Sequence, residues 1–164
     1  MIFEEEFVVR APVETVWSFL LDVPSVGPCI PGASVDRVLE EGRCYAGSLQ
    51  IRVGPISARF TGIMTVEALD CDQLVASFRA EGRDQRIGGQ VSISMVLSVG
   101  PKEGEGAIVR TRADLHLTGV IGQFGRGVIQ DIAKRTFAQF ARNVQAVIEG
   151  KRTGAPSRGV APSA

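Results

Sequence analysis

One long helical pattern, GVIGQFGRGVIQDIAKRTFAQFARNVQAVIE (Gly119–Glu149), occupies the C-terminal part of this chain. Its apolar residues recur at spacings of three and four, which is the period of a helix with one buried stripe. They are Val128, Ile129, Ile132, Ala133, Phe137, Phe140, Ala141, Val144, Val147 and Ile148. Most polar residues fall on the other side. The pattern therefore predicts one long helix that covers an apolar surface made by the rest of the chain.

Three glycines, Gly122, Gly125 and Gly127, lie near the start of this pattern, although glycine inside a helix costs roughly 1 kcal/mol relative to alanine. Two explanations are open: close packing of the helix against a strand, or space for a ligand beside the first turns. The glycines do not match the GxGxxG fingerprint, and no Lys-Ser/Thr pair completes a phosphate loop. A nucleotide site is therefore not expected.

Before Gly119 the chain consists mainly of short segments in which apolar and polar side chains alternate, as in strands with one buried face. A helical pattern begins at Pro12, and a short second turn is expected at Pro24–Gly27. Short gaps between the later segments favour antiparallel hairpins. The expected strands are Ile2–Arg10, Ser34–Glu41, Arg43–Gly54, Ser57–Leu69, Gln73–Glu81, Gln90–Val99 and Ile108–Leu117. We therefore predict an α+β fold, in which a curved seven-stranded antiparallel sheet surrounds the C-terminal helix, with two short helices after the first strand.

The alternation also predicts which side chains face the long helix. In the last four strands one face is apolar and the other is polar, so the register of the sheet is strongly specified. The apolar faces comprise Phe60, Gly62, Met64 and Val66; Leu74, Ala76, Phe78 and Ala80; Val91, Ile93, Met95, Leu97 and Val99; and Val109, Ala113, Leu115 and Leu117.

A chain of 164 residues is long enough for one domain with a substantial core. We expect this domain to span residues 1–150, followed by a disordered Gly/Ala/Pro/Ser-rich tail at 151–164. No apolar run approaches the ~20 residues of a membrane span, and no signal-peptide pattern opens the chain. Cys29, Cys44 and Cys71 form no metal or redox motif, which favours reduced thiols in a cytoplasmic protein.

The net charge is zero, but basic residues are concentrated towards the C-terminus. From Val120 onward the chain has seven basic and two acidic residues, a net charge of +5, so the preceding part carries −5. Lys134, Arg135 and Arg142 on the helix could bind an acidic protein or an anionic membrane surface; a solvated helix face is the alternative. No nucleic-acid-binding signature is present, so nucleic acid is not an expected partner.

Catalytic and metal-ligating patterns are also missing from the sequence. The single histidine, His116, is expected on the outer face of a strand, where it is a poor candidate for a general base or a metal ligand. No nucleophile elbow occurs. Glu5 and Tyr45 remain as candidates for polar groups that point inward.

Short motifs are spread over about residues 3 to 149. They are Phe7-x-Val9-x-Ala11-Pro12-x-Glu14-x-Val16-Trp17, Asp22, Cys29-Ile30-Pro31-Gly32-Ala33, Tyr45-x-Gly47, Gly54-Pro55-Ile56, Phe60-x-Gly62, Gly82-x-Asp84, Gly88-Gly89, Asp114-Leu115-x-Leu117-Thr118-Gly119 and Gln123-Phe124-Gly125. Together they resemble the family of the carbon monoxide dehydrogenase G protein (CoxG), within the SRPBCC or START-like superfamily. The first motif alone indicates only the superfamily, whereas CIPGA with GPI and FxG is more specific. Gly122 is a departure, because the family commonly has alanine there.

The resemblance implies a helix-grip fold, in which the sheet and the C-terminal helix enclose an apolar cavity. It also implies a non-enzymatic accessory role beside a molybdenum-containing carbon monoxide dehydrogenase or a related hydroxylase. Proteins similar to this one are associated with recruiting the enzyme to the membrane and with carrying a quinone. The expected ligand is therefore menaquinone or ubiquinone, and the expected location is the cytoplasm, at the inner face of the cell membrane.

Methionine and aromatic side chains adapt to a flat ring and a flexible tail, so the inward-facing ones are the expected cavity walls. The candidate ligand-binding residues are Trp17, Phe60, Met64, Phe78, Met95, Phe124, Gly125, Val128 and Ile132, and the candidate partner-binding residues are Lys134, Arg135 and Arg142. Two other hypotheses remain. A polyketide-cyclase-like enzyme would need an inward polar group such as Glu5 or Tyr45, and a docking or assembly factor would need only the basic helix face.

Overall fold

The computed structural model describes residues 1–152 of the chain. The strands are β1 (Ile2–Val9), β2 (Ala33–Glu40), β3 (Cys44–Val53), β4 (Ile56–Asp70), β5 (Val75–Asp84), β6 (Gly89–Lys102) and β7 (Gly106–Thr118). The helices are α1 (Val13–Leu21), α2 (Val23–Val26), the 3₁₀ turn η1 (Gly27–Cys29), α3 (Gly119–Gly122) and α4 (Arg126–Arg152). The expected disordered tail lies outside the described residues, except for Lys151 and Arg152, whose backbone continues α4.

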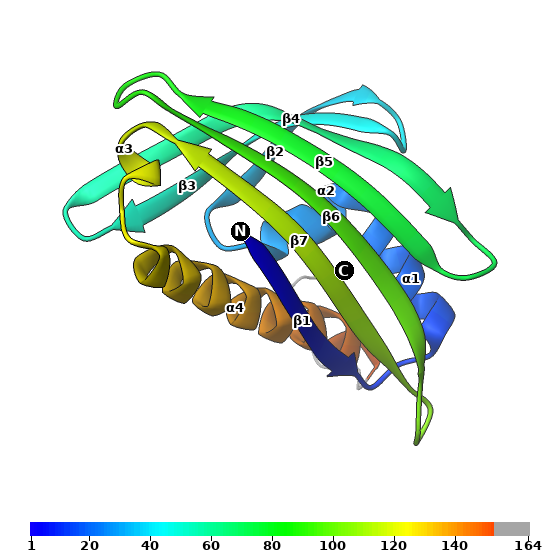
Figure 1. Ribbon diagram of the computed structural model, residues 1–164. Coiled ribbons are helices and arrows are strands. Elements are labelled where there is room, and N and C mark those ends of the chain that lie inside the picture. The colour runs from blue at the N-terminus through cyan, green and yellow to red at the C-terminus, as the bar shows by residue number, and fades with distance from the viewer. Residues whose placement is uncertain (153–164) are drawn as a thin grey trace.

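The seven strands form one antiparallel sheet in the order β1-β7-β6-β5-β4-β3-β2. Strands β2 to β7 follow one another as hairpins, and β1 closes the other edge by pairing with β7, for example through Phe7 and Val109. The sheet curves around α4, which runs beside β1 (Figure 1). The predicted α+β architecture, with two short helices after the first strand, is therefore confirmed.

Three glycines lie in register across the middle of this sheet. Gly47 of β3 pairs with Gly62 of β4, and Gly62 pairs in turn with Gly82 of β5. A Cβ atom on Gly62 would collide with the Glu81 carbonyl oxygen, and one on Gly47 would collide with the Ser34 carbonyl oxygen. Glycine in a strand interior allows such close backbone approach and a sharp bend. The row therefore lets the sheet curl, and it leaves the concave face without side chains at these positions.

The C-terminal half of α4 is held firmly between two elements. On one side Gln145 donates a hydrogen bond to the Val8 carbonyl of β1 (2.7 Å), and on the other Asn143 donates to the Cys29 carbonyl of η1 (2.8 Å). Beneath the helix, Phe7 packs edge-on against Phe137 and Phe140, with ring centroids 5.7 and 6.0 Å apart. These contacts bury the apolar stripe of this half as ordinary core.

The prediction of one continuous helix over Gly119–Glu149 is wrong, because α3 and α4 are separated at residues 123–125. The chain leaves β7 through Gly119, whose φ of +81° favours glycine. A Cβ atom on Gly122 would lie 2.6 Å from the Leu117 carbonyl oxygen. This close approach ties α3 to the end of β7, so the helix axis starts again at Arg126.

The two open explanations for the glycines apply to different residues. Gly122 is required by close backbone packing against β7, as described above. A Cβ atom on Gly125 or Gly127, in contrast, would have no non-adjacent atom within 4 Å. The first turn of α4 is therefore surrounded by open space.

Candidate ligand-binding groove

The apolar interior is divided into two clusters. The first contains Phe7, Trp17, Phe78 and Val144 and lies beneath the C-terminal half of α4. The second lies beneath α3 and the start of α4 and is built from Val53, Ala58, Phe60, Val91, Ile121 and Ile129. A single continuous core would be the usual result for a domain of this size. The division places a weakly packed region between the two clusters.

The residues of this region keep solvent-accessible surface although they point into the covered face of the sheet. Met64 of β4, Ile93 and Met95 of β6 and Leu115 of β7 are all only half-buried. The close backbone approaches of α4 are to β1 and η1, not to these central strands. Since α4 does not seal against them, apolar surface remains uncovered between the helix and the sheet.

A groove of about 360 Å³ opens beside this region. It is bounded by the first half of α4, by β3 and by the turn before β2, with the lining residues Pro31, Gly32, Leu49, Gln50, Ile51, Arg52, Ile132, Arg135 and Thr136. Its volume lies at the lower end of the range for small-molecule sites, which is roughly 300–1,000 Å³. Leu49, Ile51 and Ile132 make its floor apolar.

Local structure explains why the groove is open at this place. The pairing of β2 with β3 ends at Ala33 and Leu49, and one further bond joins the Gln50 N–H to the Gly32 carbonyl at 2.9 Å. Gly32 has a φ of +82° and turns the chain away, which only glycine does readily. Beyond this point the edge of β3 is not covered by β2, and α4 passes alongside it.

The structure distributes the predicted cavity residues over three environments. Trp17, Phe60 and Phe78 are between 2% and 7% exposed and belong to the two core clusters. Met64, Met95, Phe124 and Ile132 are half-buried, and Ile132 also lines the groove. Val128 is 43% exposed, and Gly125 is exposed beside it at the start of α4. The half-buried residues are thus the ones that a ligand could reach.

Several groove residues were not anticipated from the sequence. Leu49 and Ile51 alternate with polar neighbours in β3, so the period-2 pattern already placed them on the apolar face. Pro31 and Gly32 belong to the CIPGA motif. No local signal distinguishes Thr136 from the other polar residues of α4, because its position depends on how the helix crosses the sheet.

The three candidate partner-binding residues are all exposed on α4. Arg142 donates a hydrogen bond to the Gln139 side chain at 2.8 Å, whereas Lys134 has no salt bridge within the described residues. Arg135 differs from both because it borders the groove. The basic surface therefore begins at the rim of the groove and continues along the solvent side of the helix.

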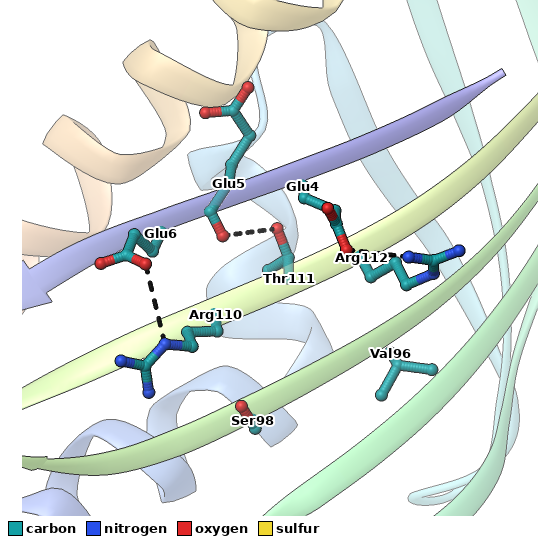
Figure 2. Close-up of a pocket in the computed structure, with 8 residues that line it drawn as sticks. All are labelled: Glu4, Glu5, Glu6, Val96, Ser98, Arg110, Thr111 and Arg112. Atoms are coloured by element: carbon teal, nitrogen blue, oxygen red, sulfur yellow. Dashed lines mark hydrogen bonds and ion pairs between the residues drawn. The ribbon is translucent and has the colours of Figure 1, made fainter.

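A larger hollow of about 520 Å³ lies on the opposite, convex face of the sheet (Figure 2). Its walls are polar and are already paired: Glu4 bonds Arg112 at 2.8 Å and Glu6 lies 3.7 Å from Arg110. An apolar molecule bound there would separate these ion pairs without covering apolar surface. The hollow is therefore a poorer ligand site than the smaller groove.

The inward polar candidates are few. Figure 2 shows the Glu5 carboxylate pointing to the α4 side of β1, away from Arg110 and Arg112. Tyr45 is 4% exposed, and its hydroxyl has no hydrogen bond within the described residues. His116 is exposed, with its Nε2 atom 3.3 Å from Asp114. No cluster of metal-ligating side chains occurs in residues 1–152.

Asp84 is a buried carboxylate with a structural role near the second cluster. It is 3% exposed and accepts hydrogen bonds from the backbone N–H groups of Arg59 (2.6 Å), Arg86 (2.8 Å) and Ile87 (3.1 Å). The bonds from Ile87 and Arg59 hold the pKa of Asp84 below its ordinary value, because they favour the charged form. Asp84 thereby joins β4 to the turn between β5 and β6.

None of the helices in the described part of the chain is long and apolar enough to cross a membrane.

Comparisons with known proteins place these features in context. The family model for the G component of carbon monoxide dehydrogenase (CoxG) matches residues 6–149. No curated protein sequence gives a match.

Solved structures share the fold at low sequence identity. A conserved protein from Geobacillus kaustophilus is 20% identical and aligns over 92% of this chain and 97% of its own, with a TM-score of 0.82. The Zhui aromatase/cyclase from Streptomyces sp. R1128 is 19% identical over 98% and 99% of the two chains, with a TM-score of 0.68. A START superfamily protein from Mycobacterium smegmatis is 16% identical over 92% and 98%, with a TM-score of 0.63. At these identities the likeness establishes the START-like, helix-grip fold and nothing about ligands.

Proposed function

Because this chain belongs to the carbon monoxide dehydrogenase CoxG family, we propose that it is a non-catalytic accessory protein that carries a hydrophobic ligand. The enzyme it serves is a molybdenum-containing carbon monoxide dehydrogenase or a related hydroxylase. The ligand is a respiratory quinone, and carrying it couples the enzyme to the membrane. This function extends the family assignment to a defined place in the molecule, the space between α4 and the concave face of the sheet.

One observation carries the proposal: apolar side chains in the middle of the covered face stay only half-buried. Burial of such surface by a ligand is favourable by roughly 25 cal/mol per Å². Met64 and Met95 are unbranched and adjust to an irregular guest. The neighbouring glycine row leaves room beside them, and the groove at Ile132 provides an opening to solvent.

Ligand binding is testable with the purified chain and a decyl-substituted benzoquinone. At a quinone concentration 100 times the Kd, binding stabilises the folded state by about 2.7 kcal/mol, which raises Tm by roughly 5–10 °C for a chain of this size. Ile132→Trp should abolish most of this rise, because the indole fills the groove. Native mass spectrometry and lipid extraction of the unsubstituted protein check for a quinone that was bound during expression.

The matched control is Ala138→Trp, since Ala138 is exposed on α4 away from the groove lining. It should keep the full Tm rise. Carriage of a quinone is disproved if added quinone leaves Tm unchanged and no quinone is extracted.

Docking to the enzyme is a separable part of the proposal. Lys134 and Arg142 are exposed cations on α4 that lie outside the groove lining, so they suit an acidic partner surface. Changing both to glutamate should weaken association with the molybdenum enzyme at least 10-fold, while the quinone-dependent Tm rise stays the same. Pull-down and titration at two salt concentrations measure the association. Equal binding by the double variant would remove these residues from the interface.

A second candidate function, catalysis on a bound polyketide-like molecule, has a specific observation in its favour. Tyr45 is buried with an unbonded hydroxyl, and Glu5 points to the α4 side of β1. An aromatase/cyclase also shares the fold. Turnover by the pure protein that is lost in Tyr45→Phe or Glu5→Gln would replace carriage by catalysis.

A further inference from the structure

The rim of the groove offers hydrogen-bond donors that have no partners within the described residues. Arg135 and Thr136 line the groove from α4, and neither side chain makes a hydrogen bond or salt bridge to residues 1–152. Each guanidinium has five N–H donors and no acceptor. The α4 side of the rim is therefore suited to oxygen atoms on a ligand.

The strand side of the rim contributes a backbone donor. Along a strand, successive N–H groups point to opposite edges, so the N–H of Arg52 points to the same edge as that of Gln50. The Gln50 N–H is bonded to the Gly32 carbonyl, but the pairing between β2 and β3 has ended before Arg52. The Arg52 N–H thus faces the groove across from Arg135.

The charge at this place has one sign. The two charged residues among those that line the groove are Arg52 and Arg135, and no carboxylate lines it. An arginine at the edge of an apolar surface attracts carboxylate, phosphate and carbonyl oxygens, and it repels ammonium groups. The apolar floor at Leu49, Ile51 and Ile132 lies directly below, so head and chain of an amphiphile would separate naturally.

We propose that the groove selects amphiphiles whose head group presents oxygen acceptors, with the head bound at Arg135 and the apolar chain directed inward past Ile132. Arg135 is thereby a specificity-determining residue for the ligand and not a partner-docking residue. The inference rests on the proposed carriage of a hydrophobic ligand and adds the chemistry and orientation of that ligand. A quinone carbonyl and a fatty-acid carboxylate share this chemistry.

Three probes with the same decyl chain test the head group: decanoate, decylamine and the decyl-substituted benzoquinone. Isothermal titration of the full chain should give at least 10-fold tighter binding of one or both oxygen-headed probes than of decylamine. Arg135→Gln should weaken the preferred oxygen-headed probe about 10-fold and leave decylamine unchanged. Lys134→Gln, one residue away on the solvent side, should change each Kd less than 2-fold.

The outcomes separate the two proposals and the two sources of oxygen. Dependence on Arg135 for decanoate alone identifies a fatty-acid-like ligand, and dependence for the quinone alone identifies a quinone. Binding of all three probes with equal affinity, or binding that Arg135→Gln does not alter, overturns the head-group inference but retains hydrophobic carriage. Failure of every probe to bind the unsubstituted chain overturns carriage itself. Circular dichroism and Tm confirm that Arg135→Gln, an exposed substitution, is folded.

Discussion

Gly62→Ala is expected to lower the free energy of unfolding by about 3 kcal/mol, because overpacking between two backbones has few ways to relax. The added Cβ atom would collide with the Glu81 carbonyl oxygen of β5. That oxygen belongs to a paired strand, so it cannot rotate away as a side chain would. For a chain of 164 residues this loss corresponds to a fall in Tm of roughly 6–12 °C.

The functional consequence follows from the place of Gly62 in the glycine row. Relief of the collision requires β4 and β5 to move apart or to flatten, which changes the curvature of the sheet around α4. Thermal and urea denaturation measure the stability, and the quinone-dependent Tm rise measures the ligand space. We expect both to decrease in Gly62→Ala.

Gly125→Ala and Gly127→Ala are the matched controls for this substitution. Neither added Cβ atom would have a non-adjacent neighbour within 4 Å. Alanine also favours the helix, so stability should stay constant or rise by less than about 1 kcal/mol. A Tm for Gly62→Ala that equals those of the controls would mean that the row does not set the curvature.

Asp84→Asn is expected to lower Tm by roughly 5–10 °C at pH 7, because an unsatisfied buried donor is costly. The carboxylate accepts three backbone N–H bonds at once, whereas an amide has one acceptor oxygen and directs an NH₂ group towards N–H donors. The bonds from Arg59 and from Arg86 and Ile87 cannot all survive. The turn between β5 and β6 should therefore separate from β4.

The same substitution predicts a specific pH dependence. The folded-state pKa of Asp84 is lowered, so its contribution is fully present above the unfolded carboxyl pKa of about 3.9 and is lost as the pH falls towards the folded value. The Tm difference between Asp84→Asn and the unsubstituted protein should be constant from pH 7 to pH 5 and shrink below pH 4. A difference that is independent of pH would show that the charge is not responsible.

Asp70→Asn provides the comparison for Asp84. Asp70 also accepts backbone N–H bonds, from Asp72 (3.1 Å) and Gln73 (3.0 Å), but it does so in an exposed turn. Water can replace these bonds, so we expect its Tm to fall by no more than about 2 °C. An equally large effect at both positions would contradict the role of burial.

The strands and their buried faces could be predicted from the sequence because their signals are local. Period-2 alternation in segments such as Val91–Val99 specifies which side chains point inward, and Gly-Pro pairs mark the hairpins. The helix break at residues 123–125 could not be predicted in this way, because the apolar spacing continues across it. It depends on the approach of Gly122 to the Leu117 carbonyl, which exists only in the folded chain.

The position of the groove also depends on the assembled fold. Among the nine residues predicted as cavity walls, Ile132 lines it, while Trp17 and Phe60 are core. Alternation shows that a side chain points inward, but it does not show whether another element covers that side chain. Coverage is set by the tilt of α4, which the hydrogen bonds of Asn143 and Gln145 fix at its C-terminal half.

The pattern Gly119–Glu149 and the seven alternating segments thus determined by themselves that a sheet surrounds a helix, since amphipathic period is a property of neighbouring residues. The motifs further indicated the family. Only the tertiary structure decided where the interior stays open, how Gly47, Gly62 and Gly82 align to bend the sheet, and why Arg135 stands at the rim of the groove. Each of these features arises between segments far apart in the chain, and the distance between such segments is not encoded in any local pattern.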